Sequence, residues 1–252
     1  MNEVILLNNI TKRFPVYDDG ISDNEQIRGG FFCALEDVSL SVKSGECTII
    51  AGANGSGKSL LMNVIAGLEE PTAGTVKTNA RIGLVFQEPD AQILGETPYE
   101  DISFGPRNMR LSKEEIRIRV NDALCQTGLE QRASFPSRSL SGGEKRRLAA
   151  AGVLAMNADV IIFDEPYANM DYPGVVQVNR LLRKLTADGK TVIILSHELE
   201  KCLALANRFI ILFKGKKVFD GSPSGALSLD MQAYGIHHPL EKTPRKLEDL
   251  LW

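Results

Sequence analysis

Four cysteines are all that the 252 residues contain, and they lie far apart in the sequence. None belongs to a C-x-x-C pair and no cluster of histidines accompanies them, whereas zinc sites and disulfide frameworks space these residues closely. The sequence therefore suggests neither a zinc site nor a disulfide framework. We interpret Cys33, Cys47, Cys125 and Cys202 as free thiols, most of them buried.

Surplus positive charge and long apolar runs are also lacking. The formal net charge is -3, and a nucleic-acid backbone binds clustered positive charge, so we expect no nucleic-acid partner. The basic runs Lys145–Arg147 and Lys214–Lys217 are interpreted as solvated faces. No apolar run approaches the length that crosses a bilayer, and the start Met1–Val4 lacks the basic and apolar parts of a signal segment. We therefore expect a cytoplasmic protein. The length of 252 residues suits one large α/β domain or a domain with an inserted lobe.

The strongest motif present is a glycine-rich loop of the pattern G-x-x-x-x-G-K-S. It follows the apolar run Cys47–Ala51 and precedes a segment with apolar residues at helical spacing. The expected buried stripe of that helix is Leu60, Leu61, Val64, Ile65 and Leu68. The pattern is therefore that of a strand, a loop and a helix.

We predict that this loop binds the phosphates of a nucleoside triphosphate. Residues without bulky side chains let successive backbone N–H groups surround a phosphate at the positive end of a helix. Lys58 would reach the outer phosphates, and the Ser59 hydroxyl would ligate the bridging Mg²⁺. The residues assigned to this site are Gly52, Ala53, Asn54, Gly55, Ser56, Gly57, Lys58 and Ser59.

Two stretches that alternate apolar and polar residues, 3 to 14 and Ala34–Val42, predict an antiparallel strand pair joined by a long polar loop. Phe14 ends the first strand, and its ring could stack on the nucleotide base. Tyr17, Phe31 and Phe32 compete for this role, and core packing is the alternative for all of them.

The later part of the chain predicts a helical insertion and then more strands. Between about residues 88 and 139, Ser112–Glu115 is a capping box, and the helix after it carries Ile116, Val120, Ala123 and Leu124 on one face. Continuously apolar segments return afterwards, as expected for parallel strands covered on both faces. These are Val160–Phe163, Thr191–Leu195 and Phe209–Phe213, with a helix beginning near Asp171 between the first two.

Polar side chains follow several of these strands, at the edge where the glycine loop presents its ligand. Asp164 would hold the magnesium ion, and Glu165 would take a proton from the attacking water. His197 could hydrogen-bond the γ-phosphate, with a structural histidine as the alternative. Gln87 could ligate magnesium or orient water, and would join the sheet to the helical segment.

A second loop, Leu140–Glu144, places a serine and two glycines at the start of a helix, where anions bind. A plain serine cap is the alternative. Two phosphate-recognising loops in one chain suggest a head-to-tail dimer, in which Ser141, Gly142, Gly143 and Glu144 cover the nucleotide of the partner.

These motifs occur in the order and spacing of ATP-binding-cassette ATPases, which the chain resembles over about residues 3 to 225. The resemblance includes Ala168–Asp171 as the D-loop and implies a P-loop NTPase α/β fold. That fold has a parallel core sheet, an N-terminal antiparallel β subdomain and a helical lobe, here about 88–155, inserted into an ATPase domain of residues 1–225. It also implies ATP and Mg²⁺ sandwiched between two ATPase subunits, and leaves 226–252 as a C-terminal extension suited to a dimer contact.

Within that family, Val85–Ile93, Glu100–Pro106 and Gly215–Gly221 look like the energy-coupling factor group of cobalt, nickel and vitamin importers. The resemblance implies a second ATPase subunit, identical or paralogous, a transmembrane coupling protein and a substrate-binding membrane component. The chain would then lie on the cytoplasmic face of the membrane. Another type of ABC transporter and a soluble, non-transport ABC ATPase are the alternatives.

The stretch Glu88–Pro106 directly follows Gln87 and is the shortest route from the nucleotide to another protein. It mixes apolar and acidic side chains, which suits a basic, amphipathic partner helix. We therefore expect the membrane partner to dock there, and a loop packed on its own lobe is the alternative. The side chains considered are Ile93, Leu94, Ile102 and Phe104 with Glu88, Asp90, Glu100 and Asp101.

Overall fold

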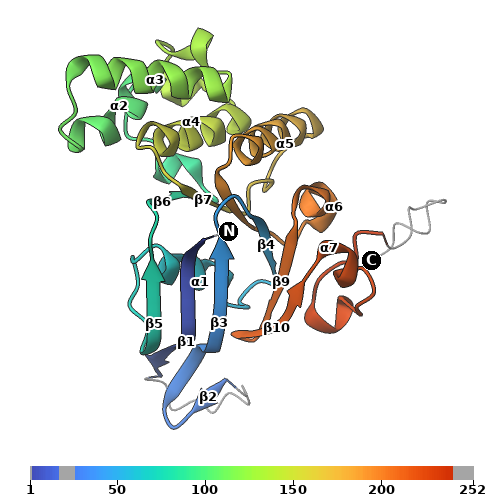
Figure 1. Ribbon diagram of the computed structural model, residues 1–252. Coiled ribbons are helices and arrows are strands. Elements are labelled where there is room, and N and C mark those ends of the chain that lie inside the picture. Colours follow the sequence, from blue (N-terminus) through green and yellow to red (C-terminus); the bar gives the residue numbers. More distant parts are fainter. Residues whose placement is uncertain (1, 17–25, 241–252) are drawn as a thin grey trace.

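The computed structural model describes residues 2–16 and 26–240, which form two sheets and a lobe of helices (Figure 1). The strands are β1 Glu3–Pro15, β2 Ile27–Arg28, β3 Phe31–Lys43, β4 Cys47–Ala51, β5 Ala73–Thr78, β6 Ile82–Val85, β7 Val160–Asp164, β8 Thr191–Leu195, β9 Arg208–Phe213 and β10 Lys216–Gly221. The α-helices are α1 Lys58–Ile65, α2 Pro98–Asn108, α3 Lys113–Thr127, α4 Gly142–Ala155, α5 Tyr172–Ala187, α6 Leu199–Cys202 and α7 Pro223–Ala226.

The six-stranded sheet has the order β10-β9-β4-β8-β7-β6, and every pair except β10 with β9 is parallel. Each residue of β4, β7 and β8 is buried, which confirms that the continuous apolar runs are strands covered on both faces. The carboxyl ends of β4, β6, β7 and β8 therefore meet at one edge of the sheet, where the candidate site lies.

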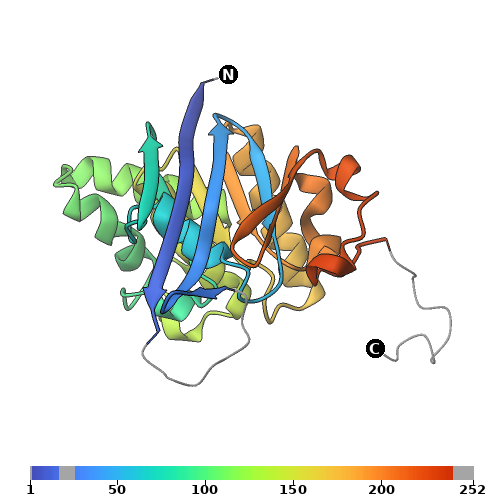
Figure 2. The ribbon, with the colours of Figure 1, turned by 90° about the horizontal axis from the view of Figure 1, so that it is seen from below.

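The second sheet is antiparallel, with the order β2-β3-β1-β5. The expected pairing of β1 with β3 is confirmed, although β3 begins at Phe31 rather than Ala34. Apolar side chains of β1, β3 and α1 form one core with one face of the six-stranded sheet. In the view of Figure 2 the blue strands of this sheet lie in front of α1. Tyr17, one candidate for base stacking, lies outside the described residues.

Helices α2, α3 and α4 lie together at the top of Figure 1 and form a lobe. It has its own hydrophobic cluster. The expected face of α3 is confirmed, because Val120, Ala123 and Leu124 are buried and Ile116 packs against them. The capping box at Ser112 is also present.

Helix α1 ends earlier than its apolar pattern suggests. Gly67 adopts a left-handed conformation, φ 71°, just past the helix, so Leu68 leaves the helical face and is 63% exposed. Met62, which the expected stripe did not include, is buried. The prediction that Leu68 belongs to the buried stripe was therefore wrong.

The basic run Lys145–Arg147 was expected to be a solvated face, and this was wrong for Arg146. The run lies in the second turn of α4, a helix that packs against α2, α3, α5 and β6. Arg146 points inward and is only 5% exposed. A charge at that position is tolerated because backbone carbonyls accept hydrogen bonds from both terminal nitrogens of the guanidinium, as described below.

The C-terminal part of the chain packs on the six-stranded sheet as far as it is described. Ala226, Met231 and Ile236 are buried in the same hydrophobic cluster as β4, β7 and β8. Residues 241–252, the rest of the expected C-terminal extension, lie outside the described residues. Within the described residues no helix combines the length and the apolar character needed to span a membrane.

Three of the four cysteines, Cys33, Cys47 and Cys202, are buried and Cys125 is exposed, and all four are free thiols. This agrees with the sequence interpretation. Burial raises the pKa of the Cys47 thiol to about 11, so that thiol is protonated at neutral pH and has little nucleophilic character.

Candidate nucleotide site

The loop between β4 and α1 borders a cavity of about 370 Å³ at the carboxyl edge of the sheet. Eight residues assigned to the site from the sequence lie in its lining, and five of them carry reactive or polar side chains from distant segments: Gln87, Lys58, Ser59, Glu165 and His197. They follow β6, β4, β7 and β8, so four segments far apart in the sequence converge there. The remaining lining residues are Ala34, Asn54, Gly55, Gly57 and Leu60.

The three loop glycines are needed for different reasons. A Cβ at Gly52 would lie 2.3 Å from the carbonyl oxygen of Leu212, and one at Gly57 would lie 3.0 Å from that of Ala34. Gly57 also has φ 101°. At Gly55 the same Cβ would meet no described atom within 4 Å. Gly52 and Gly57 therefore allow close packing of the loop on β9 and β3, and Gly55 leaves room for a ligand.

Lys58 folds back over its own loop. Its Nζ donates to the carbonyl oxygens of Gly52 at 2.7 Å and Ala53 at 3.2 Å, and lies 3.8 Å from Oε1 of Glu165. Burial lowers the pKa of the ammonium, and the carboxylates of Glu165 and Asp164 oppose that shift. An anionic phosphate is a stronger acceptor than a neutral carbonyl, so a ligand entering the loop would compete well for this group.

Glu165 is held in a constrained geometry directly after β7. Its Oε1 is 2.9 Å from Nδ1 of His197, and its backbone N–H donates to the carbonyl of Leu195. Its φ is 43°, in the left-handed region that costs a non-glycine residue free energy. Oε2 is buried without a hydrogen-bond partner in the described part of the chain. One carboxylate oxygen is thus fixed by His197 and the other remains available as an acceptor.

Asp164 and Ser59 provide oxygen atoms that fit a magnesium ion. A hydrogen bond joins the Ser59 hydroxyl to the Asp164 carboxylate, and Asp164 Oδ1 is buried with no partner among the described residues. Burial raises the pKa of Asp164, and the hydrogen bond from Ser59 opposes the increase. Hard oxygen ligands next to a phosphate loop are what Mg²⁺ prefers.

Phe14 does not line this cavity. Its ring is 39% exposed, pairs across the strands with Phe32, and has the Lys12 ammonium 5.2 Å from its centroid. The residue that the antiparallel sheet contributes to the lining is Ala34, which the sequence analysis missed. No local signal identifies Ala34, because its place depends on how β3 packs against the loop.

Ser141 is the N-cap of α4, in the lobe, and is not in the lining of the cavity. Its hydroxyl accepts from the N–H of Glu144, whose carboxylate accepts from the N–H of Ser141 and from Arg132 at 3.0 Å. Ser141 and Gly142 are exposed. The side chain of Glu144 is therefore engaged in the cap, while Ser141 and the glycines remain open to another molecule.

Residues 35–168 match the family model described as ABC transporter. The chain is 40% identical over 210 residues to the energy-coupling factor transporter ATP-binding protein EcfA2 of Methanospirillum hungatei, a match covering 77% of this chain and 53% of that protein. The chain thus spans about half the length of that relative.

Two solved structures have the same fold. One is cbiO1 from Clostridium perfringens, described as part of the ABC transporter complex cbiONQ, with TM-score 0.78 and 32% identity over 90% of this chain and 92% of that one. The other is the ATP-binding cassette MJ0796, in a dimeric post-hydrolysis state bound to ADP and Pi. Its TM-score is 0.72, with 29% identity over 87% of this chain and 98% of that one.

Proposed function

The chain belongs to the ABC transporter family, and we propose that it is the ATP-hydrolysing subunit of an energy-coupling factor importer for a vitamin or a transition-metal ion. It would act on the cytoplasmic face of the membrane. The convergence of Lys58, Glu165 and His197 in one cavity supports ATP hydrolysis, and the likeness to EcfA2 and cbiO1 supports the importer type.

The geometry supports a division of roles within the cavity. Lys58 binds the outer phosphates, and Glu165, held through one oxygen by His197, accepts a proton from the attacking water with the other. Asp164 and Ser59 would hold Mg²⁺, with Gln87 as a further ligand from the lining of the same cavity. The ion would neutralise part of the phosphate charge. Purified chain should therefore hydrolyse ATP only with a divalent cation, and hydrolysis should be lost in Lys58→Ala.

A second subunit, identical or paralogous, would complete the site. Ser141 and Gly142 are exposed and Gly143 is half-buried at the start of α4, and all three are separate from the cavity of their own chain. Helix N-termini with free backbone N–H groups bind phosphate. In a head-to-tail dimer each such terminus would therefore close over the nucleotide of the partner subunit.

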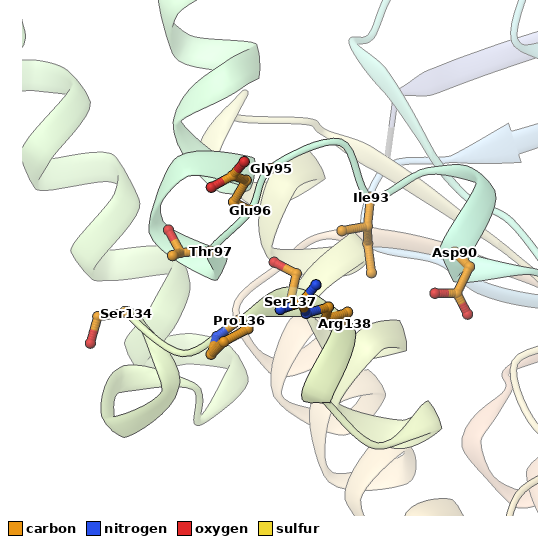
Figure 3. A pocket seen from close by; sticks show the side chains of 9 residues that line it. All are labelled: Asp90, Ile93, Gly95, Glu96, Thr97, Ser134, Pro136, Ser137 and Arg138. Carbon is orange, nitrogen blue, oxygen red and sulfur yellow. The ribbon is translucent and has the colours of Figure 1, made fainter.

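A groove of about 510 Å³ in the lobe fits the docking of the membrane partner (Figure 3). One wall comes from the segment after Gln87, with Asp90, Ile93 and Glu96, and the other comes from residues 134–138. A basic, amphipathic helix would place its cations against the acidic wall. The groove would then connect the membrane subunit to the nucleotide site through Gln87.

The structure changes which side chains of Glu88–Pro106 can test this proposal. Ile102 is fully buried in the lobe, so it cannot contact a partner. The Asp101 carboxylate accepts from the N–H groups of Leu94 at 2.7 Å and Gly95 at 2.9 Å, and Asp90 pairs with Lys145 at 2.6 Å. Charge reversal at Asp101 or Asp90 would therefore disturb the lobe itself.

Glu96→Lys is the cleaner test, because Glu96 is exposed and lines the groove. We expect membrane recruitment, measured by sedimentation with membranes, to fall about tenfold, while ATP hydrolysis by the isolated chain changes less than about twofold. Asp122→Lys, an equal reversal on the exposed side of α3, is the control. Equal recruitment of the two variants would place the docking surface elsewhere.

A further inference from the structure

The buried guanidinium of Arg146 joins three backbone carbonyls from two distant segments. Its Nη1 donates to the carbonyl oxygens of Pro166 at 2.8 Å and Ala168 at 3.1 Å, and its Nη2 donates to that of Gln87 at 2.7 Å. Arg146 itself belongs to α4 of the lobe. One side chain of the lobe thus holds the segment after β7 and the segment after β6.

These two segments carry candidate catalytic residues. Pro166 directly follows Glu165, and Gln87 is itself in the lining of the cavity. The carboxylate of Glu198, next to His197, also acts electrostatically on Arg146, where it opposes the lowering of the guanidinium pKa by burial. The segments after β6, β7 and β8 therefore all lie within the influence of one cation.

A buried arginine is costly unless its hydrogen bonds are specific. Its immediate neighbours on the buried face, such as Ala149 and Ala150, are apolar, and an apolar residue would avoid the desolvation cost of a charge. The planar fork of arginine can bind carbonyls on two segments at a fixed spacing, which the single ammonium of lysine cannot reproduce. The residue type therefore indicates a geometric role.

We propose that Arg146 is a positioning residue that fixes Gln87 and Glu165 relative to α4. The proposal rests on the function proposed above. Ser141, the candidate contact with the partner's nucleotide, caps the same helix about 7.5 Å from Arg146 along the helix axis. If α4 shifts when Ser141 binds the partner's nucleotide, the side chain of Arg146 therefore transmits that shift to Gln87 and Glu165 of its own chain.

Arg147 supplies a matched control. It is the next residue of α4, is also partly buried, and its Nη1 donates to the carbonyl oxygens of Thr127 at 2.9 Å and Gly128 at 3.4 Å. These carbonyls lie at the end of α3, inside the lobe. Replacing Arg147 thus removes comparable hydrogen bonds without touching the segments of the site.

Hydrogen exchange of the full chain tests the positioning directly. The amides of Ala168 and Met170, and those of Ala91 and Gln92, are hydrogen-bonded and report on the two segments. In Arg146→Lys and Arg146→Met we expect exchange there to be about tenfold faster. Arg147→Lys should leave these amides unchanged and accelerate exchange near Gly128 instead.

Steady-state kinetics provide the second measurement. Both Arg146 variants should lower kcat for ATP about tenfold with KM changed less than about twofold, because the side chain contacts no nucleotide. Arg147→Lys should retain the kcat of the unmodified chain. Unchanged exchange at both segments in folded Arg146→Met, or the same exchange pattern in Arg147→Lys, would overturn the proposal. If the unmodified chain hydrolyses no ATP either alone or with its paralogue, the proposed function fails, and hydrogen exchange still decides the role of Arg146.

Discussion

Replacing Glu165 with glutamine is expected to leave ATP binding intact and to lower ATP turnover by about two to four orders of magnitude, the usual contribution of a positioned base. Glutamine keeps the shape of the side chain and can still meet His197 Nδ1, which lies 2.9 Å from Oε1 in the unmodified chain. Its amide cannot accept the proton of the attacking water. Binding and hydrolysis should therefore separate in this variant.

Size-exclusion chromatography with ATP and Mg²⁺ is the matching measurement. Without hydrolysis the closed dimer cannot reopen, so Glu165→Gln should elute as a dimer with bound ATP and the unmodified chain as a monomer. Glu200→Gln, an exposed carboxylate on α6, should behave as the unmodified chain does. Normal turnover by folded Glu165→Gln would remove Glu165 from the mechanism.

The second large effect is expected from Ser141→Arg, which should abolish closure of the dimer and reduce hydrolysis to background. The N-cap position is exposed, so the folded chain tolerates a long side chain there better than it would in the core. The loss of the cap itself costs about 1 kcal/mol. The bulky cation would occupy the space that the partner's nucleotide needs.

Mixing variants shows whether this effect acts on the partner subunit. Lys58→Ala damages the site of its own chain, and Ser141→Arg damages the site of its partner. A mixed dimer therefore keeps one unmodified composite site and should regain hydrolysis that neither variant has alone. If the chain works only with a paralogue, the two substitutions must be divided between the two proteins. Full ATP-dependent dimerisation of Ser141→Arg would contradict the sandwich arrangement.

The sequence predicts the sheet edge well because its signals are local. Continuous apolar runs identify β7 and β8 without further context, and the glycine loop identifies the turn from β4 into α1. Parallel strands present their carboxyl ends together. Glu165 and His197, which follow different strands, could therefore be expected to meet, as they do.

Features that depend on packing between distant segments could not be predicted in this way. The run Lys145–Arg147 has the local pattern of a solvated face, yet Arg146 is buried because the carbonyls of Gln87 and Pro166 come from segments 59 and 20 residues away. Asp101 likewise has the local pattern of a surface charge, but its carboxylate accepts hydrogen bonds from the N–H groups of Leu94 and Gly95. The charge pattern of a short segment does not reveal hydrogen-bond partners that come from elsewhere in the chain.

The choice of the base-stacking aromatic shows the same limit. Alternation identifies β1 and β3, but it does not show where the end of β1 lies relative to the glycine loop. In the structure Ala34, rather than Phe14, borders the cavity. Phe14 therefore stays a prediction. Loss of ATP affinity in Phe14→Ala, with Phe135→Ala in the helical lobe as the exposed aromatic control, would support the prediction. Equal ATP affinities of the two variants would contradict it.

Affinity purification from detergent-solubilised membranes of the source cells tests the transport role most directly. The tagged chain should retain a multi-spanning membrane protein in fixed stoichiometry, and Glu96→Lys should lose that protein while keeping its ATPase activity. A chain that hydrolyses ATP but stays in the soluble fraction, with no membrane protein bound, would contradict the account.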